Sequence, residues 1–381
     1  MHLLLSAEES EAELRSEFTR SFPAAPLQVA LPLLCETELD LTAARPLPHL
    51  IFARQFLPNA RLMRAESIRA WAGALLDAVA GVLPDEQPWA LHIEPHYGVR
   101  TLHRIGARAW HSATRNRRPP LGDRMLESEE PGVDAEAGRH RCRLIREALV
   151  ELLQKKRRHL LRQLRPEPVP FTPKDSLVQL LLTAPDAGFV SVAPAPDPFQ
   201  DRHWVSPFPK GEVPLASDKT APSRAFAKLV EAELRLGRSI RAGETCVDLG
   251  ASPGSWTWLA SLRGARVTAI DRSPLREDLM SDARVEFQQG DAFRFQPPRT
   301  ADWLLCDVIA APERTAALLA EWARRRWCRY FVVTLKLGDS PGADALKRLK
   351  HELPALTREL FLTRLCANKK EVCAFGEVTP L

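Results

Sequence analysis

The fold of this 381-residue chain is decided by one stretch, Cys246-Val-Asp-Leu-Gly-Ala-Ser-Pro-Gly-Ser-Trp-Thr257. An apolar strand runs into a loop of small residues and then into a helix. Gly250 and Gly254 let the loop backbone approach a ligand closely, because glycine has no side chain and tolerates positive φ. Asp248 precedes them, where its carboxylate can reach a cationic group. The pattern predicts a ligand-binding turn between a strand and a helix.

Strand-like and helical segments alternate regularly around this turn in the second half of the chain. Apolar runs predict strands at 245–249, 266–270, 285–288, 303–306, 330–335, 360–365 and 372–375. Helical periodicity predicts helices that include 313–326 and 343–352. Such alternation indicates an α/β fold with a doubly wound, mostly parallel, Rossmann-like sheet. The ligand crevice of such a sheet lies beyond the carboxyl ends of its strands.

Acidic residues follow two further predicted strands. Asp271 stands 21 positions after Gly250, where a carboxylate can accept both hydroxyls of a ribose. Asp291 follows the third strand and can bond an adenine amino group. The loop lacks both GxGxxG and GK[ST], and the acids, Asp248 included, would repel a pyrophosphate or triphosphate. They suit a sulfonium with an α-amino group, so S-adenosylmethionine fits better than NAD or ATP.

Composition and charge set the broad class of the protein. The chain has 53 Lys and Arg against 48 Asp and Glu, a net charge of +5, which permits nucleic-acid binding without arguing for it. Its seven Cys form no CxxC pair, and we expect reduced thiols. No apolar run approaches the ~18 residues of a membrane helix, and the apolar start is too short for a secretory signal. We therefore expect a cytoplasmic protein without a membrane partner.

The first half of the chain has an α+β pattern. Strand-like runs lie at 3–5, 50–56, 89–94, 177–182 and 188–192, and helical runs at 8–18 and 68–82. Five prolines between 193 and 209 predict the main domain junction near residue 205.

Basic residues of the first half gather in two stretches, 100–118 and 139–165. In the second, apolar residues recur at three- and four-residue intervals, which predicts an amphipathic helix with a basic opposite face. Two interpretations stay open for the basic residues: a solvated helix face, or a surface that contacts RNA phosphates. Trp71, Trp89 and Trp110 are scattered, which favours recognition of RNA shape and backbone over base stacking.

Further motifs accompany the stretch at 246–257. They are APSRAFAKL (221–229), LCDV (305–308), TLKL (334–337) and KEV (370–372). Together they resemble the FtsJ-like ribose 2′-O-methyltransferases. Within that family, SPFPK (206–210) and HLIFARQ (49–55) look like the bacterial 23S rRNA cytidine 2′-O-methyltransferases. The resemblance implies S-adenosylmethionine as cofactor, 23S rRNA as partner and a monomeric enzyme that methylates a cytidine ribose, with neither DNA nor a metal involved.

The family uses a Lys-Asp-Lys-Glu tetrad, which the resemblance places at Lys228, Asp307, Lys336 and Glu371. Lys336 is implied as the base, held uncharged by burial and nearby positive charge so that its amine can take the ribose proton. Lys228 would supply that charge and steady the developing oxyanion, while the carboxylates orient the lysines. The cofactor-binding residues that the resemblance implies are Ser223, Asp248, Gly250, Ser252, Pro253, Gly254, Ser255, Trp256, Asp271, Asp291 and Asp307.

One residue of the loop departs from the family pattern. The family usually has PGGW, whereas this chain has Ser255 in place of the second glycine. A left-handed backbone angle at Ser255 would cost roughly 1 kcal/mol. Ser255 must therefore accept whatever backbone angle the second glycine has in the family.

The resemblance also implies a domain organisation. It places a ferredoxin-like domain at 1–60, a THUMP-like RNA-binding domain with a basic insertion at 61–195, a linker at 196–222 and the methyltransferase domain at 223–381. Two other functions stay open at this point. One is the same chemistry on another RNA such as tRNA. The other is a catalytically silent RNA-binding protein, which only the Ser255 departure supports.

Overall fold

The computed structural model of the chain describes residues 1–7, 9–39, 47–83, 86–97, 133–166, 172, 174–193, 204–213, 218–337, 342–367 and 370–380. The chain divides into two compact units. Unit 1 comprises Met1–Leu4, Gln28–Leu39 and Leu57–Pro198. Unit 2 comprises Leu5–Leu27, Asp40–Phe56 and Phe199–Leu381, and contains the predicted ligand-binding turn.

A seven-stranded sheet forms the centre of unit 2. Its strands are β9 (Thr245–Leu249), β10 (Arg266–Asp271), β11 (Val285–Gln289), β12 (Ala301–Cys306), β13 (Cys328–Lys336), β14 (Thr357–Thr363) and β15 (Glu371–Val378). They lie in the order β11-β10-β9-β12-β13-β15-β14. The first five are mutually parallel, and β15 runs antiparallel to β13 and β14. The predicted doubly wound, mostly parallel sheet is confirmed.

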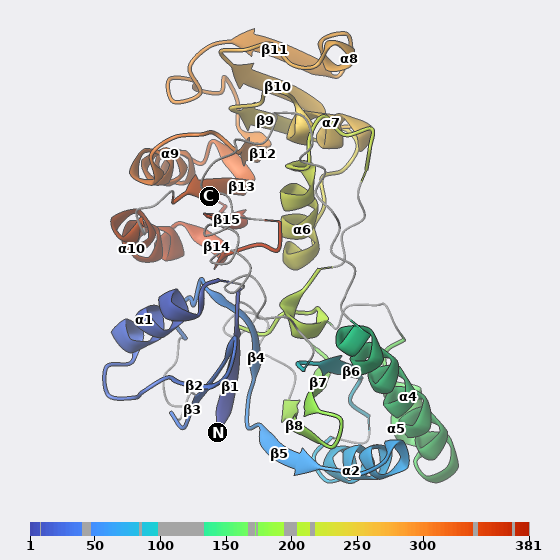
Figure 1. Ribbon diagram of the computed structural model, residues 1–381. Helices are drawn as coiled ribbons and strands as arrows, with labels where there is room; N and C mark the ends of the chain where they lie inside the picture. The colour runs from blue at the N-terminus through green and yellow to red at the C-terminus, as the bar shows by residue number, and fades with distance from the viewer. Residues whose placement is uncertain are drawn as a thin grey trace, which may run out of the picture. The chain divides into compact units, whose positions relative to one another are not determined.

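Helices cover both faces of this sheet (Figure 1). On one side lie α6 (Phe226–Leu236) and α7 (Ser255–Leu262), and on the other lie α9 (Pro312–Arg325) and α10 (Ala343–Glu352). The short elements of the unit are α8 (Glu277–Met280), η1 (Pro209–Gly211) and η2 (Leu353–Ala355).

Local sequence explains where two of these helices begin and end. α6 stops at Gly237, whose φ of +69° is a left-handed angle that glycine adopts without a steric penalty. α9 starts with Pro312, whose missing N–H costs nothing in the first turn of a helix.

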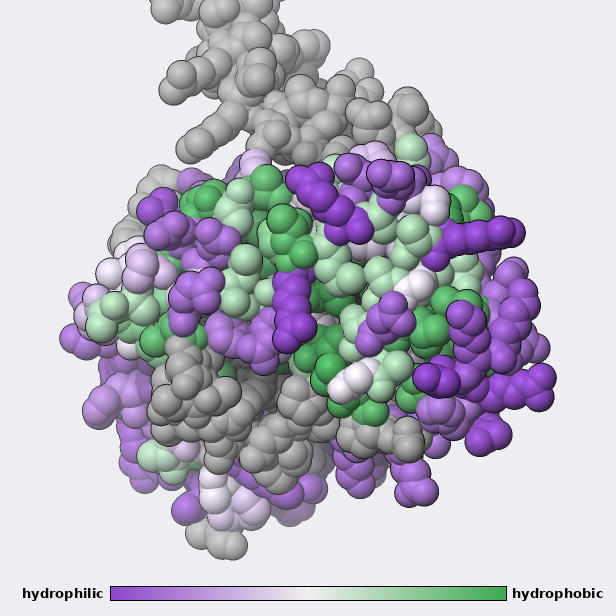
Figure 2. All heavy atoms as spheres, turned by 90° about the horizontal axis from the view of Figure 1, so that it is seen from below, coloured by the Kyte–Doolittle hydropathy of each residue, from purple (hydrophilic) through white to green (hydrophobic). Residues whose placement is uncertain are grey.

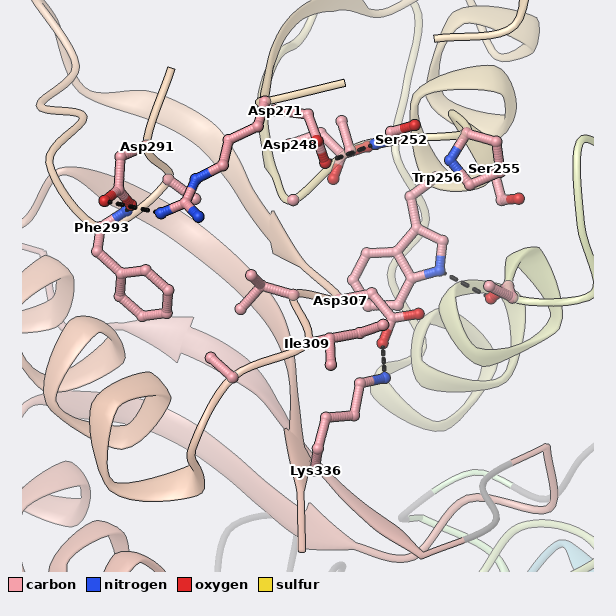
Figure 3. A pocket seen from close by; sticks show the side chains of 18 of the residues that line it. Asp248, Ser252, Ser255, Trp256, Asp271, Asp291, Phe293, Asp307, Ile309 and Lys336 are labelled. Carbon is pink, nitrogen blue, oxygen red and sulfur yellow. Dashed lines mark hydrogen bonds and ion pairs between the residues drawn. The ribbon is translucent and has the colours of Figure 1, made fainter. Parts of the chain in front are cut away.

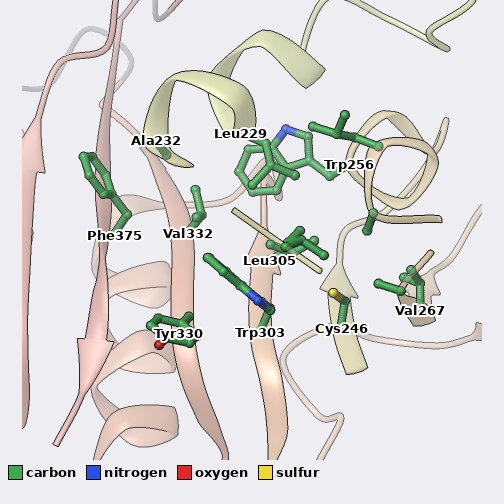
Figure 4. Close-up of a cluster of buried hydrophobic side chains, with 14 of the residues drawn as sticks. Leu229, Ala232, Cys246, Trp256, Val267, Trp303, Leu305, Tyr330, Val332 and Phe375 are labelled. Carbon is green, nitrogen blue, oxygen red and sulfur yellow. The ribbon is translucent and has the colours of Figure 1, made fainter. Parts of the chain in front are cut away.

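Apolar side chains of α6, α7 and the facing strands form the main core of unit 2 (Figure 4). Trp303 is fully buried and stacks on Tyr330 with ring centroids 4.8 Å apart. Trp256 is also buried, and its indole N–H donates to the Ala225 carbonyl at 2.7 Å. Each such ring removes roughly 150–250 Å² from water. This packing holds α7, and with it the loop that precedes α7, against α6 and the strands β9 and β10.

Two four-stranded sheets contain the other strands. One has the order β2-β3-β1-β4, from β1 (His2–Ser6), β2 (Gln28–Leu31), β3 (Leu34–Thr37) and β4 (Ala53–Leu57). The other has the order β5-β8-β7-β6, from β5 (Arg61–Arg64), β6 (Trp89–Pro95), β7 (Ser176–Ala184) and β8 (Ala187–Ala193). The helices are α1 (Glu11–Ser21), α2 (Ile68–Ala80), α4 (Val133–Lys156) and α5 (Arg158–Gln163). The α+β pattern is confirmed, although the prediction omitted β2, β3 and β5 and began β4 three residues early.

α4 confirms the predicted amphipathic helix. Ile145, Leu149 and Leu153 of its apolar stripe are fully buried in the core of unit 1. The four basic residues at 155–158 are exposed. The other basic stretch, 100–118, lies outside the described residues. Figure 2 shows one face of the molecule, on which apolar side chains gather toward the middle and hydrophilic ones surround them.

Two expectations from composition concern the whole chain. All seven cysteines are free thiols, and all except Cys366 are buried. No helix in the described part of the chain has the length and apolar character that crossing a membrane requires.

Candidate active site

A pocket of about 550 Å³ opens at the carboxyl ends of the parallel strands (Figure 3). The strand order reverses between β9 and β12, so the loops that leave these two strands diverge and a crevice forms between them. The predicted position of the crevice is confirmed. The predicted site residues that line it are Ser223, Asp248, Gly250, Ser252, Pro253, Ser255, Trp256, Asp271, Asp291, Asp307 and Lys336.

The glycine loop after β9 needs both of its glycines for conformation. Gly250 has a φ of +75°, and a Cβ there would lie 2.8 Å from the Cβ of Val308. Gly254 has a φ of +110°, and a Cβ there would collide with Leu279 of α8. Gly254 is not among the residues that line the pocket. It shapes the loop, while Gly250 lies on the pocket wall.

Ser255 is unstrained, so the cost that a left-handed angle would carry at this position does not arise. It is the first residue of α7, and the left-handed angle falls on the preceding Gly254. The Ser255 hydroxyl lies 2.7 Å from the hydroxyl of Ser223, which links the loop to the segment before α6. A serine therefore replaces the second glycine without a conformational penalty, and the departure gives no support to a silent protein.

Asp248 is the buried acid of the pocket. It is 2% exposed, and one of its oxygens accepts a hydrogen bond from the Thr257 hydroxyl at 2.7 Å. Burial raises the pKa of Asp248 to about 7, because the charged form loses its water. The Thr257 bond opposes this rise, and the negative charges of Asp307 and Asp271 add to it. A cation bound in the pocket would favour the ionised form.

Asp271 ends β10 and Asp291 follows β11, and both are hydrogen-bond acceptors. Asp271 accepts the N–H groups of Ser252 at 3.0 Å and Ser273 at 2.9 Å, one on each oxygen. Each carboxylate oxygen has a second lone pair, so Asp271 can still accept two hydroxyls. The backbone N–H of Phe293, 2.9 Å away, lowers the pKa of Asp291, and two arginines near its other oxygen lower it further. Asp291 is therefore an ionised acceptor.

Lys228, Asp307, Lys336 and Glu371 form a closed ring of alternating charge. The Lys228 Nζ lies 3.1 Å from Asp307 Oδ2 and 2.6 Å from Glu371 Oε2. The Lys336 Nζ lies 2.5 Å from Asp307 Oδ1 and 2.8 Å from Glu371 Oε1. Residues far apart in sequence meet because α6 packs beside β15 and the β13–β15 register pairs Lys336 with Glu371. Asp307 and Lys336 reach the pocket, whereas Lys228 and Glu371 close the ring behind them.

The expectation that its surroundings hold Lys336 uncharged is wrong. Burial by itself would lower the pKa of Lys336, as expected. Asp307 and Glu371 outweigh burial, however, and the pKa lies above its ordinary value. The sequence placed Lys228 and both carboxylates near Lys336, but it did not show that the attraction of the carboxylates outweighs burial and the neighbouring positive charge. Lys336 must therefore lose its own proton before it can accept another.

Three residues near the ring and the pocket were missed from sequence. Thr334 is fully buried on β13, and its hydroxyl donates to Asp307 Oδ1. The Arg314 guanidinium lies 3.8 Å from the Phe293 ring centroid at the pocket wall. Strand alternation could have indicated Thr334, because residues two apart in a strand share a face with each other. Nothing in the sequence indicated the pairing of Arg314 with Phe293, which depends on where α9 packs.

The motifs HLIFARQ and SPFPK join a buried polar network of unit 2. The Gln55 side-chain amide donates to the Ser206 carbonyl at 3.1 Å. Arg235 donates to Ser206 Oγ at 3.4 Å and pairs with the fully buried Glu231 at 2.8 Å. Glu231 also accepts the backbone N–H of Cys366 at 2.8 Å. The network fixes the β14–β15 connection to α6. Because β15 carries Glu371 and α6 carries Lys228, it also helps to position these two members of the ring.

Comparison with known proteins bears on this geometry. Residues 221–326 match the FtsJ-like methyltransferase family model. The FtsJ-like region includes Lys228, the glycine loop, the three pocket acids and Asp307, and it ends before Lys336. The resemblance that the sequence predicted is confirmed.

Curated relatives extend the comparison beyond the FtsJ-like region. The "Ribosomal RNA large subunit methyltransferase M" of Thauera aminoaromatica is 38% identical over 192 residues, which cover 48% of this chain and 52% of that protein. The protein of the same name from Halorhodospira halophila is 38% identical over 243 residues, 62% of this chain and 64% of that protein. The chain thus spans between half and two thirds of these relatives' length. The solved structure of TrmN from Thermus thermophilus aligns over 99% of both chains with 14% identity and a TM-score of 0.31, a weak likeness.

Proposed function

We propose that this protein is an S-adenosylmethionine-dependent methyltransferase that methylates the ribose 2′-hydroxyl of a cytidine in 23S rRNA. The observation that carries the proposal is the ring of Lys228, Asp307, Lys336 and Glu371 beside an acidic pocket. The FtsJ-like match supports the reaction class, and the printed name of the curated relatives supports large-subunit rRNA as the substrate.

The pocket fits S-adenosylmethionine in size and in donor set. A volume of about 550 Å³ is typical of a small-molecule site. Asp248 would hold the α-amino group, Asp271 the ribose hydroxyls and Asp291 the adenine amino group. The loop residues on the pocket wall would complete the cofactor site. When bound, the cofactor supplies a methyl group on a sulfonium, which is an electrophile strong enough for a hydroxyl oxygen.

The ring would supply the proton acceptor that a ribose hydroxyl needs. The partly exposed Lys336 ammonium would first release its proton to solvent water, and the neutral amine would then take the proton of the 2′-hydroxyl. Lys228 would stabilise the negative charge that develops on the oxygen. Asp307 and Glu371 each contact both lysines, so they hold the two amines at a fixed separation. Proximity and orientation supply much of the remaining rate.

We propose that the first half of the chain binds the RNA. It would comprise the ferredoxin-like domain at 1–60 and the THUMP-like domain at 61–195, joined by the linker at 196–222 to the methyltransferase domain at 223–381. The exposed basic run at 155–158 supports a phosphate-contacting surface. We propose a cytoplasmic monomer.

Transfer of a labelled methyl group tests the proposal. The purified protein is incubated with tritium-labelled S-adenosylmethionine and with either 23S rRNA or tRNA from cells that lack the gene. We expect label at one cytidine of 23S rRNA. The product should resist alkaline cleavage at that position, because methylation removes the 2′-hydroxyl that attacks the neighbouring phosphate. Label in tRNA alone would contradict the rRNA assignment, and label that does not protect against alkali would contradict ribose methylation.

Substitution of Lys336 tests the role of the ring. Lys336→Ala should abolish transfer and leave RNA affinity nearly intact, because the amine acts on the hydroxyl and not on RNA docking. Lys347→Ala, which removes an exposed lysine of α10, is the matched control and should retain transfer. Unchanged methylation by the Lys336 variant would remove this residue from the mechanism.

A further inference from the structure

We infer that Thr334 is a positioning residue that limits how tightly Asp307 holds the Lys336 ammonium, and so makes Lys336 available as the base. The inference rests on the proposed function of the same site. The sequence resemblance named four residues of the ring, and Thr334 is not one of them.

The first argument is the crowding of donors on one carboxylate oxygen. Asp307 Oδ1 accepts hydrogen bonds from Lys336 at 2.5 Å, from Lys228 at 3.2 Å and from the Thr334 hydroxyl. A carboxylate oxygen has two lone pairs, so the three donors share its electron density. Of the three, only the hydroxyl carries no charge.

The second argument is the fixed placement of Thr334. The β13–β15 register pairs Thr334 with Cys373 and Lys336 with Glu371, which puts Thr334 and Lys336 on the same face of the sheet. Thr334 is fully buried. Its β-branched side chain has few allowed χ1 angles, so its hydroxyl cannot turn away to another partner at low cost.

The consequence follows from the strength of bonds to charged groups. A neutral donor on a carboxylate withdraws electron density from it and weakens its attraction for a neighbouring ammonium. Without the hydroxyl, the two lysines would share Asp307 Oδ1 between them, and Lys336 would release its proton less readily. Thr334 therefore weakens the attraction of Asp307 for the Lys336 ammonium, which is one of the interactions that raise the pKa of Lys336.

The other groups that face the ring leave this role to Thr334. From β15 come Glu371, which is itself a ring member, and Cys373. From the end of β12 comes Cys306. Burial raises the pKa of both thiols well above the neutral range, so they stay uncharged. The negative charge of Asp307 adds to the raised pKa of Asp248 on β9, and Asp248 is held by its own threonine, Thr257.

Amine reactivity tests the inference without any methyl transfer. The lysine amines compete for a limiting amount of acetic anhydride over a range of pH. The acetylation of each site is followed by peptide mass spectrometry, with the exposed Lys347 as internal standard. In Thr334→Val, which keeps the shape and removes the hydroxyl, we expect acetylation of Lys336 at a fixed pH to fall about threefold to tenfold. Thr334→Ser should restore it, and Thr334→Cys, a weak donor, should fall between them.

The control is the other buried threonine that donates to a carboxylate in the site. Thr257→Val removes the hydroxyl that bonds to Asp248 and should leave the acetylation of Lys336 unchanged. In the methylation assay, the pH at which kcat rises should move upward in Thr334→Val, while the KM for the cofactor stays constant.

Two results would overturn the inference. One is a flat series, in which Lys336 reacts alike in the Ser, Cys and Val variants. The other is an equal effect of Thr257→Val. If the Val variant does not fold, the comparison of Ser with Cys still decides the outcome. If the wild type methylates no RNA, the proposed function fails, whereas the acetylation series still decides whether Thr334 acts on Lys336.

Discussion

Replacing Asp248 with Asn should stabilise the fold at alkaline pH and weaken cofactor binding. Asp248 is 2% exposed, and burial raises its pKa from an ordinary 3.8 to about 7. In the unfolded chain the carboxyl ionises near the ordinary value. Between these two values the folded protein therefore keeps a proton that the unfolded chain has released. The free energy of unfolding must then fall as pH rises through this window.

The size of the effect follows from the shift. A difference of about 3 pH units, at ~1.4 kcal/mol for each unit, costs the folded protein on the order of 4 kcal/mol above about pH 7 and almost nothing below about pH 4. An asparagine carries no charge and can still accept the Thr257 hydroxyl, which lies 2.7 Å from the carboxylate. Asp248→Asn should therefore gain stability over wild type progressively between about pH 4 and pH 7.

Urea unfolding of both proteins at several values of pH measures this gain. Asp302→Asn is the control for loss of one carboxylate from the same sheet, because Asp302 also accepts a threonine hydroxyl, that of Thr245 at 2.9 Å, but is only partly buried. A stability difference between Asp248→Asn and wild type that does not change with pH would refute the reasoning. So would a difference that is larger in acid.

Calorimetry of S-adenosylmethionine binding completes the test. Below about pH 7, wild type should release protons on binding, since the bound ammonium favours the ionised Asp248. Comparison of two buffers with different ionisation enthalpies reveals that release. Asp248→Asn should bind about 10-fold to 100-fold more weakly, because it loses a charge-assisted hydrogen bond. Equal affinity would show that Asp248 does not hold the amino group.

Gly250→Ala should weaken cofactor binding and cost about 1–2 kcal/mol or more of stability, since it adds left-handed strain and a contact with Val308. Gly243→Ala has the strain without the contact, since a Cβ there meets nothing within 4 Å; equal cofactor affinity in the two variants, measured by calorimetry, would contradict this reasoning. Replacing the basic residues at 155–158 with Ala should weaken RNA binding and reduce the slope of log affinity against log salt by about 3. An unchanged slope in filter-binding titrations would return this run to a solvated helix face.

Sequence patterns were sufficient where the physical cause is local. Apolar runs predicted inner strands of the large sheet such as β12 and β13, because a strand buried on both faces needs apolar residues throughout. The stripe of Ile145, Leu149 and Leu153 predicted α4, because one helix face must be covered. The glycine loop predicted the pocket, because its turn needs the positive φ of Gly250.

Local patterns failed where a property depends on neighbours that are distant in the chain. Sequence reasoning left open whether a left-handed angle falls on Ser255, and the start of α7 places that angle on Gly254. It expected a neutral Lys336, but the sign of a pKa shift depends on which charges approach most closely. The antiparallel insertion of β15 beside β13 brings Glu371 to that amine, and no local pattern specifies this pairing.

The sequence by itself therefore determined the strands, the amphipathic helix, the glycine turn and the identities of the residues that carry chemistry. Tertiary structure alone decided the strand order, the closed ring of charges, the raised pKa values of Asp248 and Lys336, and the contact of Thr334 with Asp307. The physical reason is range: steric and apolar preferences act between near neighbours in the chain, whereas electrostatic effects act through space between groups that only the fold brings together.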